Sequence, residues 1–320
     1  MDREKVPGTI RGVTIPYIEP SEADRTVSEK TEKRIELAAY KRLPPWVRTR
    51  LPSGKRFLRL RDLLRREGLP TVCESAICPN RGECWSRGVA TFLIMGDVCT
   101  RACRFCNVKT GRPGPLDGSE PLRVARAVRE LALRHVVITS VDRDDLSDGG
   151  ASFFAGVIQA VRVENPACTV EVLVPDFKGS QDAADRVIDA SPDIFGHNIE
   201  TVPSLYSRVR RGSVYLRSLD LLRHADVRGG VRVKTGIMVG LGECRDELRR
   251  TMEEIQETGC EILTIGQYLR PSPAHHEVRK FYTPGEFDEL RQEAISMGFP
   301  RVMAGPLVRS SYLADQQIAG

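Results

Sequence analysis

The sequence contains no long hydrophobic run. No stretch approaches the roughly 18 consecutive apolar residues that identify a membrane-spanning helix. Residues 1–36 interleave acidic and basic residues and lack the apolar core of a secretion signal. We therefore expect no membrane anchor and a cytoplasmic location.

Histidine is also scarce, with five residues, the first of which is His135. Cysteine occurs nine times, and six cysteines crowd into one stretch: Cys73, Cys78, Cys84, Cys99, Cys103 and Cys106. An odd total without a secretion signal argues against a disulfide framework, because the cytosol keeps thiols reduced. A metal in this stretch must be held largely by thiolates, which select zinc or an iron–sulfur cluster.

The cysteine spacing favours the cluster. A first triplet, Cys73, Cys78 and Cys84, has the pattern C-x4-C-x5-C, and a second triplet, Cys99, Cys103 and Cys106, has the pattern C-x3-C-x2-C. Structural zinc prefers paired C-x2-C knuckles that close a four-ligand tetrahedron. Three cysteines on a cubane cluster instead leave one iron open for a substrate, a cofactor or another ligand. One zinc ion held by four of the six thiolates remains the alternative.

The second triplet, in the string GDVCTRACRFCNV, resembles the radical S-adenosylmethionine enzymes. In that superfamily the three cysteines bind a [4Fe–4S] cluster, and an aromatic residue, here Phe105, precedes the third. The resemblance implies that the open iron chelates S-adenosylmethionine. It also implies that an electron from the cluster releases a 5′-deoxyadenosyl radical, which abstracts hydrogen from an unactivated carbon. A purely electron-carrying cluster is the alternative.

The first triplet, in the string VCESAICPNRGECW, resembles the auxiliary-cluster motif of the lipoyl synthase family. The string GPLVRSSY near the C-terminus is similar to that family's ending. The resemblance implies a second [4Fe–4S] cluster, with Ser311 rather than Ser310 as its fourth ligand. It extends over residues 41–312, through strings such as KRLPPWVRT, HNIETVP and QYLRPS. Ile77, with Arg81 and Gly82, is a local departure that leaves the cysteine spacing intact.

Apolar runs alternate with amphipathic stretches after Cys106. The expected strands are residues 90–95, 135–140, 170–174, 194–199, 232–239 and 262–268, and helical patterns include residues 122–133 and 247–257. Six repeats of strand and helix predict an α/β fold with a parallel sheet, either a barrel or a doubly wound sheet.

The resemblance implies the barrel: a partial (β/α)6 TIM-type barrel with an N-terminal auxiliary-cluster extension and a C-terminal extension. The length of 320 residues suffices for one such α/β domain or for two ordinary domains. We divide the chain into an extension (1–40), a basic segment with the first triplet (41–88), the barrel (89–300) and a C-terminal segment (301–320).

The active site of a parallel barrel lies at the carboxyl ends of its strands. Gly149 and Gly150 resemble the superfamily's glycine-rich contact to the methionyl amine, with an ordinary turn as the alternative. Asn198 and Glu200 share one face of an extended segment and are candidates for the ribose or methionyl group. We expect His197 to be structural. We also expect His275 and His276 to lie at the surface, and Cys168, Cys244 and Cys260 to be isolated thiols.

The net charge of +5 is concentrated near the N-terminus, where residues 41–66 contain ten basic residues and one acidic residue. This stretch is either a solvated basic face or a site for an acidic partner, phosphate or a membrane surface. Few aromatic residues accompany it, namely Tyr40, Trp46 and Phe57, so nucleic acid is disfavoured.

The resemblance implies an enzyme that inserts two sulfur atoms at C6 and C8 of an octanoyl chain. The chain is carried by a lipoyl carrier domain or by the glycine-cleavage H protein, and the auxiliary cluster is consumed as the sulfur donor. Lipoyl carrier domains are generally acidic, which suits the basic stretch. A ferredoxin or flavodoxin would supply electrons, and cluster-assembly proteins would load the iron. The alternatives are another two-cluster radical enzyme and a non-enzymatic cluster carrier.

Overall fold

The computed structural model describes residues 9–10, 13–14, 43–47, 54–87 and 89–316. The chain divides into two compact units, residues 1–45 and 46–320. In the first unit, strand β1 (Thr9–Ile10) pairs antiparallel with β2 (Val13–Thr14). The rest of the expected extension 1–40 lies outside the described residues. The second unit contains both cysteine triplets.

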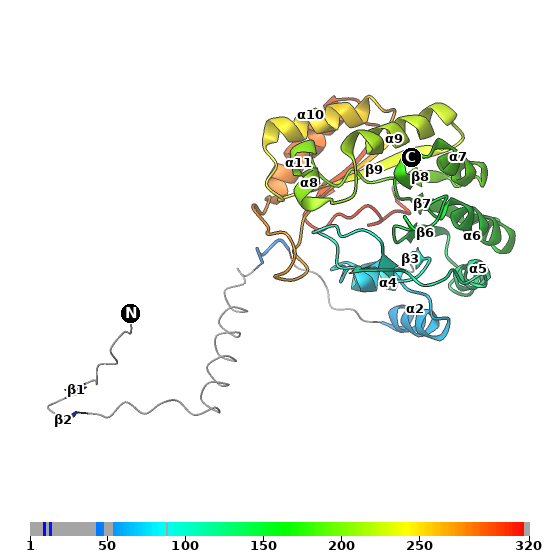
Figure 1. Ribbon diagram of the computed structural model, residues 1–320, viewed down its shortest axis with the longest axis horizontal. Coiled ribbons are helices and arrows are strands. Elements are labelled where there is room, and N and C mark those ends of the chain that lie inside the picture. The colour runs from blue at the N-terminus through cyan, green and yellow to red at the C-terminus, as the bar shows by residue number, and fades with distance from the viewer. Residues whose placement is uncertain (1–8, 11–12, 15–42, 48–53, 88, 317–320) are drawn as a thin grey trace. The chain divides into compact units, whose positions relative to one another are not determined.

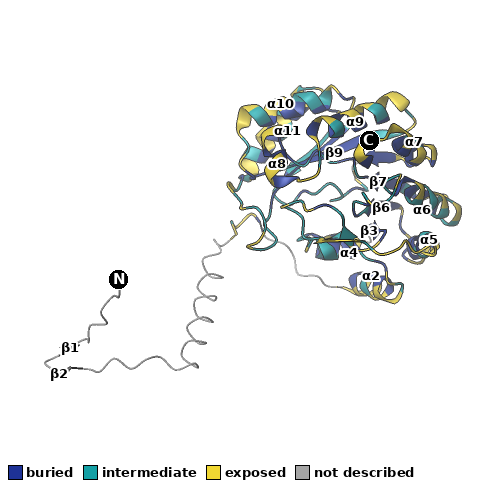
Figure 2. Ribbon diagram, viewed as in Figure 1, coloured by how far each residue is buried: buried dark blue, intermediate teal, exposed yellow. Residues whose placement is uncertain are grey.

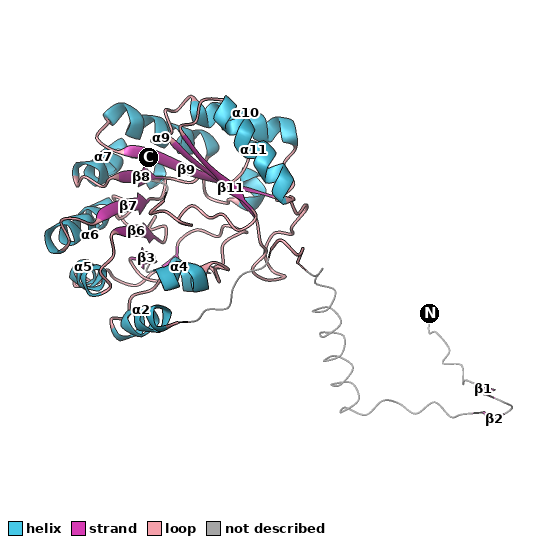
Figure 3. Cartoon of the chain, turned by 180° about the vertical axis from the view of Figure 1, so that it is seen from behind, coloured by secondary structure: helices cyan, strands magenta, loops and turns pink. Residues whose placement is uncertain are grey.

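A seven-stranded parallel sheet organises the second unit (Figures 1 and 3). In order of adjacency its strands are β11 (Arg301–Gly305), β10 (Ile262–Gln267), β9 (Arg232–Val239), β8 (Ile194–Gly196), β7 (Thr169–Leu173), β6 (His135–Ser140) and β3 (Thr91–Ile94). All neighbouring pairs are parallel, and their order follows the chain without the reversal of a doubly wound sheet. Among the described strands, β3 and β11 are the edges, so the architecture is a partial barrel.

Helices cover the outer face of this sheet, while the strands are largely buried (Figure 2). They are α5 (Glu120–Glu130), α6 (Ala151–Glu164), α7 (Gln181–Asp189), the one-turn α8 (Tyr206–Val209), α9 (Tyr215–Arg228), α10 (Arg245–Gln256) and α11 (Pro284–Ser296). Their inner faces are apolar, as in α10, where Leu248, Met252 and Ile255 are buried at helical spacing. Within the described residues, no helix is both long and apolar enough to cross a membrane.

The elements before the sheet carry the first triplet. They are α2 (Lys55–Arg66), α3 (Val72–Ser75) and α4 (Arg81–Arg87), and a parallel pair, β4 (Val98–Cys99) and β5 (Lys109–Thr110), flanks the second triplet. Helix α2 packs its apolar residues Phe57, Leu60 and Leu64 inward, and all of its arginines except the half-buried Arg61 are exposed. The Thr71 side chain accepts a hydrogen bond from the Glu74 backbone and so starts α3, the helix that contains Cys73.

The expected fold class is confirmed, and all six expected strands exist. The expected strand count is wrong by one, because β11 joins the sheet beside β10. Strand β11 begins one residue after the expected range 89–300, and the division of the chain stays a prediction. Strand β8 is also shorter than expected and ends at Gly196, so Asn198 and Glu200 follow the strand instead of completing it.

Candidate active site

The second triplet lies at the carboxyl end of β3, in the loop that begins with β4. The Cys99 Sγ accepts hydrogen bonds from the backbone N–H groups of Arg101 (3.4 Å) and Asp142 (3.3 Å). Burial raises the pKa of Cys99 and Cys103 to about 12 and that of Cys106 to about 11. Thiolates form at such positions when a bound cation compensates for their burial, which is what the irons of a cluster provide.

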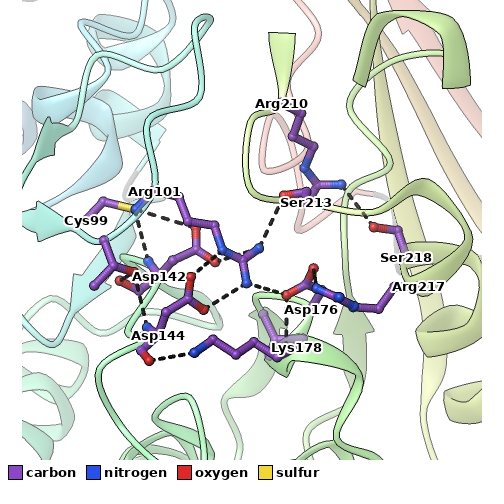
Figure 4. Close-up of polar contacts among 12 residues, drawn as sticks. Cys99, Arg101, Asp142, Asp144, Asp176, Lys178, Arg210, Ser213, Arg217 and Ser218 are labelled. Atoms are coloured by element: carbon purple, nitrogen blue, oxygen red, sulfur yellow. Dashed lines mark hydrogen bonds and ion pairs between the residues drawn. The ribbon is translucent and has the colours of Figure 1, made fainter. Parts of the chain in front are cut away.

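Arg101 fixes this loop to the mouth of the barrel (Figure 4). Its guanidinium donates to both carboxylate oxygens of Asp144 at 2.8 and 2.9 Å, to Asp176 at 2.6 Å, and to the Ser213 hydroxyl at 3.2 Å. Asp144 follows β6, Asp176 follows β7, and Ser213 precedes α9. One buried side chain thus ties the cysteine loop to three other loops. The sequence analysis missed it, although the arginine lies between two expected ligands.

The three thiols of the first triplet interact with one another. Burial, followed by the charge of Cys78, raises the pKa of Cys73 to about 11, and burial, followed by the charges of Cys73 and Cys78, raises that of Cys84 to about 12. Beside them, Trp85 is fully buried, and its indole nitrogen has no hydrogen-bond partner among the described residues. An orphaned buried donor next to three thiols fits a sulfur-rich group bound there.

The C-terminal segment that follows β11 lies against α4. The Asn80 side chain donates to the Leu307 carbonyl at 2.5 Å, and Tyr312 donates to Glu83 at 3.2 Å. The Leu313 backbone lies close to the Cys84 thiol and lowers its pKa against the larger, opposing effect of burial. Residues 307–313 therefore bring both candidate serines close to the first triplet.

Asn198 distinguishes the two serines. Its Nδ2 donates to the Ser310 hydroxyl at 3.0 Å and to Glu200 at 3.0 Å. Ser310 is thus engaged towards the barrel, which favours Ser311 for the first triplet. Asn198 and Glu200 do lie together, as their spacing predicts. Burial raises the pKa of the Glu200 carboxyl, although Arg210 opposes the shift.

Gly149 and Gly150 form a left-handed turn before α6, with φ of 59° and 90°. A Cβ on Gly150 would collide with the Met95 sulfur, and one on Gly149 would lie 3.1 Å from the Phe177 ring. The close approach that these glycines allow is therefore to neighbouring side chains. Phe105 is half-buried and packs against the hydrophobic core.

His275 and His276 are not surface residues, contrary to expectation. Both are half-buried, and His275 Nε2 lies 3.1 Å from the Cys106 carbonyl oxygen. The His276 backbone donates to the Arg104 carbonyl at 2.9 Å, and its Nε2 lies 2.8 Å from the Leu241 carbonyl oxygen. The loop after β10 thus packs on the cysteine loop. The sequence could not predict this packing, because the two histidines contact backbone carbonyl groups of distant loops, which leave no motif in the sequence.

The expectations for His197 and for the three isolated cysteines, Cys168, Cys244 and Cys260, are confirmed. His197 is fully buried, 2.8 Å from the Val174 carbonyl oxygen and 3.0 Å from the Ser218 hydroxyl. All nine cysteines are unpaired, with Cys168 and Cys260 buried and Cys244 exposed. No group of three or more histidine, cysteine, aspartate or glutamate side chains in the described residues suits a single metal ion. In a cubane cluster each thiolate binds a different iron, so the ligands are more widely spaced than around zinc.

Comparisons with known proteins give the family. The model of the radical SAM superfamily matches residues 93–255, and the model of the N-terminal domain of lipoyl synthase matches residues 16–78. The lipoyl synthase of Rubrobacter xylanophilus is 55% identical over 275 residues, covering 86% of each chain. The chain belongs to the lipoyl synthase family. A second relative, the lipoyl synthase of Methylococcus capsulatus, is 50% identical over 309 residues, covering 95% of this chain and 96% of the relative.

Solved structures support the fold independently. Methylornithine synthase superposes with a TM-score of 0.51 at 13% identity and covers 84% of this chain and 85% of its own. SuiB of Streptococcus suis bound to S-adenosylmethionine gives 0.53 at 10% identity and covers 88% and 62%, respectively. Membership of the lipoyl synthase family makes this chain a radical SAM sulfur-inserting enzyme.

Proposed function

We propose that this enzyme holds two [4Fe–4S] clusters at the two triplets. Cys99, Cys103 and Cys106 would ligate the cluster that binds S-adenosylmethionine. The auxiliary cluster would be ligated by Cys73, Cys78, Cys84 and Ser311. The observation that carries the second assignment is the hydrogen bond from Tyr312 to Glu83, because it holds the residue next to Ser311 against the helix that contains Cys84.

The proposed substrate is an octanoyl chain amide-linked to a lysine of a lipoyl carrier domain or of the glycine-cleavage H protein, which gains sulfur at C6 and C8. When bound, the clusters and S-adenosylmethionine supply the deoxyadenosyl radical and the sulfur. Aliphatic C–H bonds have no acidic proton or leaving group, so acid–base catalysis does not reach them. The chain's own residues hold the reactants in near-contact and exclude water.

The residues proposed to contact S-adenosylmethionine are Phe105, Gly149, Gly150, Asn198 and Glu200. Asn198 has a particular place among them, because its side chain contacts Ser310, next to the proposed auxiliary ligand. A group bound at Asn198 and a cluster bound at Ser311 would therefore be neighbours. Their proximity suits a reaction in which a carbon radical meets a sulfur atom.

We also propose that the basic stretch, residues 41–66, receives an acidic carrier protein. Only part of this stretch, chiefly α2, lies among the described residues. Three arginines of α2 already have partners within the chain. Arg59 donates to the Glu130 carbonyl oxygen, Arg61 to the Asp62 carboxylate, and Arg66 to the carboxylates of Glu67 and Glu130. Arg56 and Arg65 are exposed on the same helix. Their replacement by Glu is expected to raise KM for a carrier protein more than for an octanoyl-lysine peptide, and equal effects contradict docking here.

A ferredoxin or flavodoxin is the proposed electron donor, and cluster-assembly proteins would load the iron. We place the reaction in the cytoplasm, where thiols stay reduced.

The test of the function uses anaerobically reconstituted protein, S-adenosylmethionine, a reductant and an octanoyl-lysine peptide, followed by mass spectrometry and iron counting. The expected products are a peptide with two added sulfurs and two molecules of 5′-deoxyadenosine. A variant with the first triplet changed to serine is expected to cleave S-adenosylmethionine without inserting sulfur. Sulfur insertion by that variant contradicts the assignment of the auxiliary cluster.

A further inference from the structure

Trp85 is held rigidly beside the first triplet. It directly follows Cys84 in α4, and no part of its side chain is exposed. The Phe57 ring packs against it, with centroids 5.2 Å apart and planes inclined by 32°. The Arg81 guanidinium lies over the indole, 5.6 Å from the ring centroid. A cation in this position draws on the π-electron density of the ring.

The indole N–H is a donor without an adequate acceptor. It makes no hydrogen bond among the described residues, although burying an unpaired N–H costs free energy. The indole faces the Cys73 thiol, but their geometry falls short of a normal hydrogen bond. A neutral thiol is a weak acceptor, whereas thiolates and the sulfurs of a cluster carry negative charge and accept more strongly.

We propose that Trp85 is a positioning residue of the auxiliary cluster, and that its indole N–H donates to a sulfur atom at the corner held by Cys73. This inference rests on the proposed presence of that cluster. The orphaned donor is then satisfied when the cluster is loaded. Hydrogen bonds to cluster sulfurs stabilise the reduced, more negative state and so raise the reduction potential.

The sequence provides a matched control, because it contains two tryptophans. Trp46 donates its indole N–H to the Tyr282 carbonyl at 3.0 Å, and no cysteine is involved. Trp85→Phe and Trp46→Phe therefore delete the same chemical group at two places. The reduction potential of the auxiliary cluster is measured by electron paramagnetic resonance in reconstituted protein whose second triplet is changed to alanine.

Trp85→Phe is expected to shift the potential to a more negative value with iron content unchanged, while Trp46→Phe leaves it in place. If both variants and the parent protein retain iron and have the same cluster reduction potential, the role of Trp85 is overturned, but the presence of the cluster is not. Failure of the parent to bind this cluster overturns the proposed function instead.

A second measurement covers the case in which Trp85→Phe loses iron or does not fold. In otherwise unaltered protein labelled with ¹⁵N at the indole nitrogens, loading the clusters is expected to shift and broaden the Trp85 indole signal far more than the Trp46 signal. A Trp85 signal as little affected as that of Trp46 overturns the proposal.

Discussion

Asn107 donates a hydrogen bond from Nδ2 to the carbonyl oxygen of Ser75 over 2.9 Å. Asn107 follows Cys106 directly, and Ser75 lies between Cys73 and Cys78, so one bond joins the loops of the two triplets. In the proposed reaction, their relative position decides whether the radical formed at the second triplet can meet sulfur held at the first.

Asn107→Asp removes the donor and nearly preserves the shape. We expect more 5′-deoxyadenosine per sulfur inserted, because a small misplacement of reacting groups is costly. The ratio is measured by mass spectrometry after a single turnover. A ratio equal to that of the parent protein would show that the bond has no part in coupling the two loops.

The two adjacent serines are expected to behave differently. Ser311→Ala should lose iron from the first triplet, whereas Ser310→Ala should retain it, because Ser310 is engaged with Asn198. Iron counting and Mössbauer spectra of the reconstituted variants measure this. Iron loss in Ser310→Ala alone would reverse the assignment.

Arg101→Gln is expected to destabilise the fold and loosen the second triplet. Breaking a buried ion pair by removing one partner costs about 3–5 kcal/mol, and Arg101 has 4% of its side chain exposed. Arg104→Gln, an exposed arginine in the same loop, is the control. Thermal unfolding and iron content compare the two, and equal effects would contradict the role of Arg101.

Two glycines near and within α6 are expected to respond oppositely to alanine. Gly150→Ala should destabilise by about 1–3 kcal/mol, because φ is 90° and the new Cβ meets Met95. Gly156→Ala, inside α6 with nothing within 4 Å of the new Cβ, should stabilise by roughly 0.5–1 kcal/mol. Melting temperatures measure both, and a stable Gly150→Ala protein would contradict the collision.

The free energy of unfolding is expected to fall as the pH falls, because the buried His197 stays neutral in the folded chain. The Val174 carbonyl only accepts, so Nδ1 carries the hydrogen and Nε2 accepts from Ser218. Burial, reinforced by the charge of Arg210, lowers the pKa of His197 to about 3. In the unfolded chain this histidine is protonated below about pH 6.5, whereas in the folded chain it stays neutral down to about pH 3. Its effect on the free energy of unfolding is absent above about pH 6.5. Below that, the free energy of unfolding falls by roughly 1.4 kcal/mol per pH unit as the pH falls towards 3.

The variant His197→Gln cannot titrate at this position and should show a flatter decline of melting temperature between pH 6.5 and 5 than the parent protein. Parallel curves would show that His197 does not drive the effect.

Sequence patterns located the strands because buried parallel strands are continuous apolar runs, such as residues 135–140. Strand β11 was not predicted, because four of its five residues are only half-buried and Arg301 stands at its start, which weakens the apolar pattern. The cysteine spacing predicted two triplets of candidate ligands, and their assignment to two clusters rests on the family resemblance and stays a prediction. The contacts of Arg101, His275 and Trp85 were not, because each depends on which loops the barrel brings together.

The C-terminal segment also orders events in time. Residues 73–84 emerge early in synthesis, but Tyr312, which donates a hydrogen bond to Glu83 beside Cys84, emerges after β11 has been made. A nascent chain folds from its N-terminal side as it is released. The proposed auxiliary site therefore stays incomplete until β11, the last described strand of the barrel, has left the ribosome, and an oxygen-sensitive, sulfur-rich group would be installed only after that strand is made.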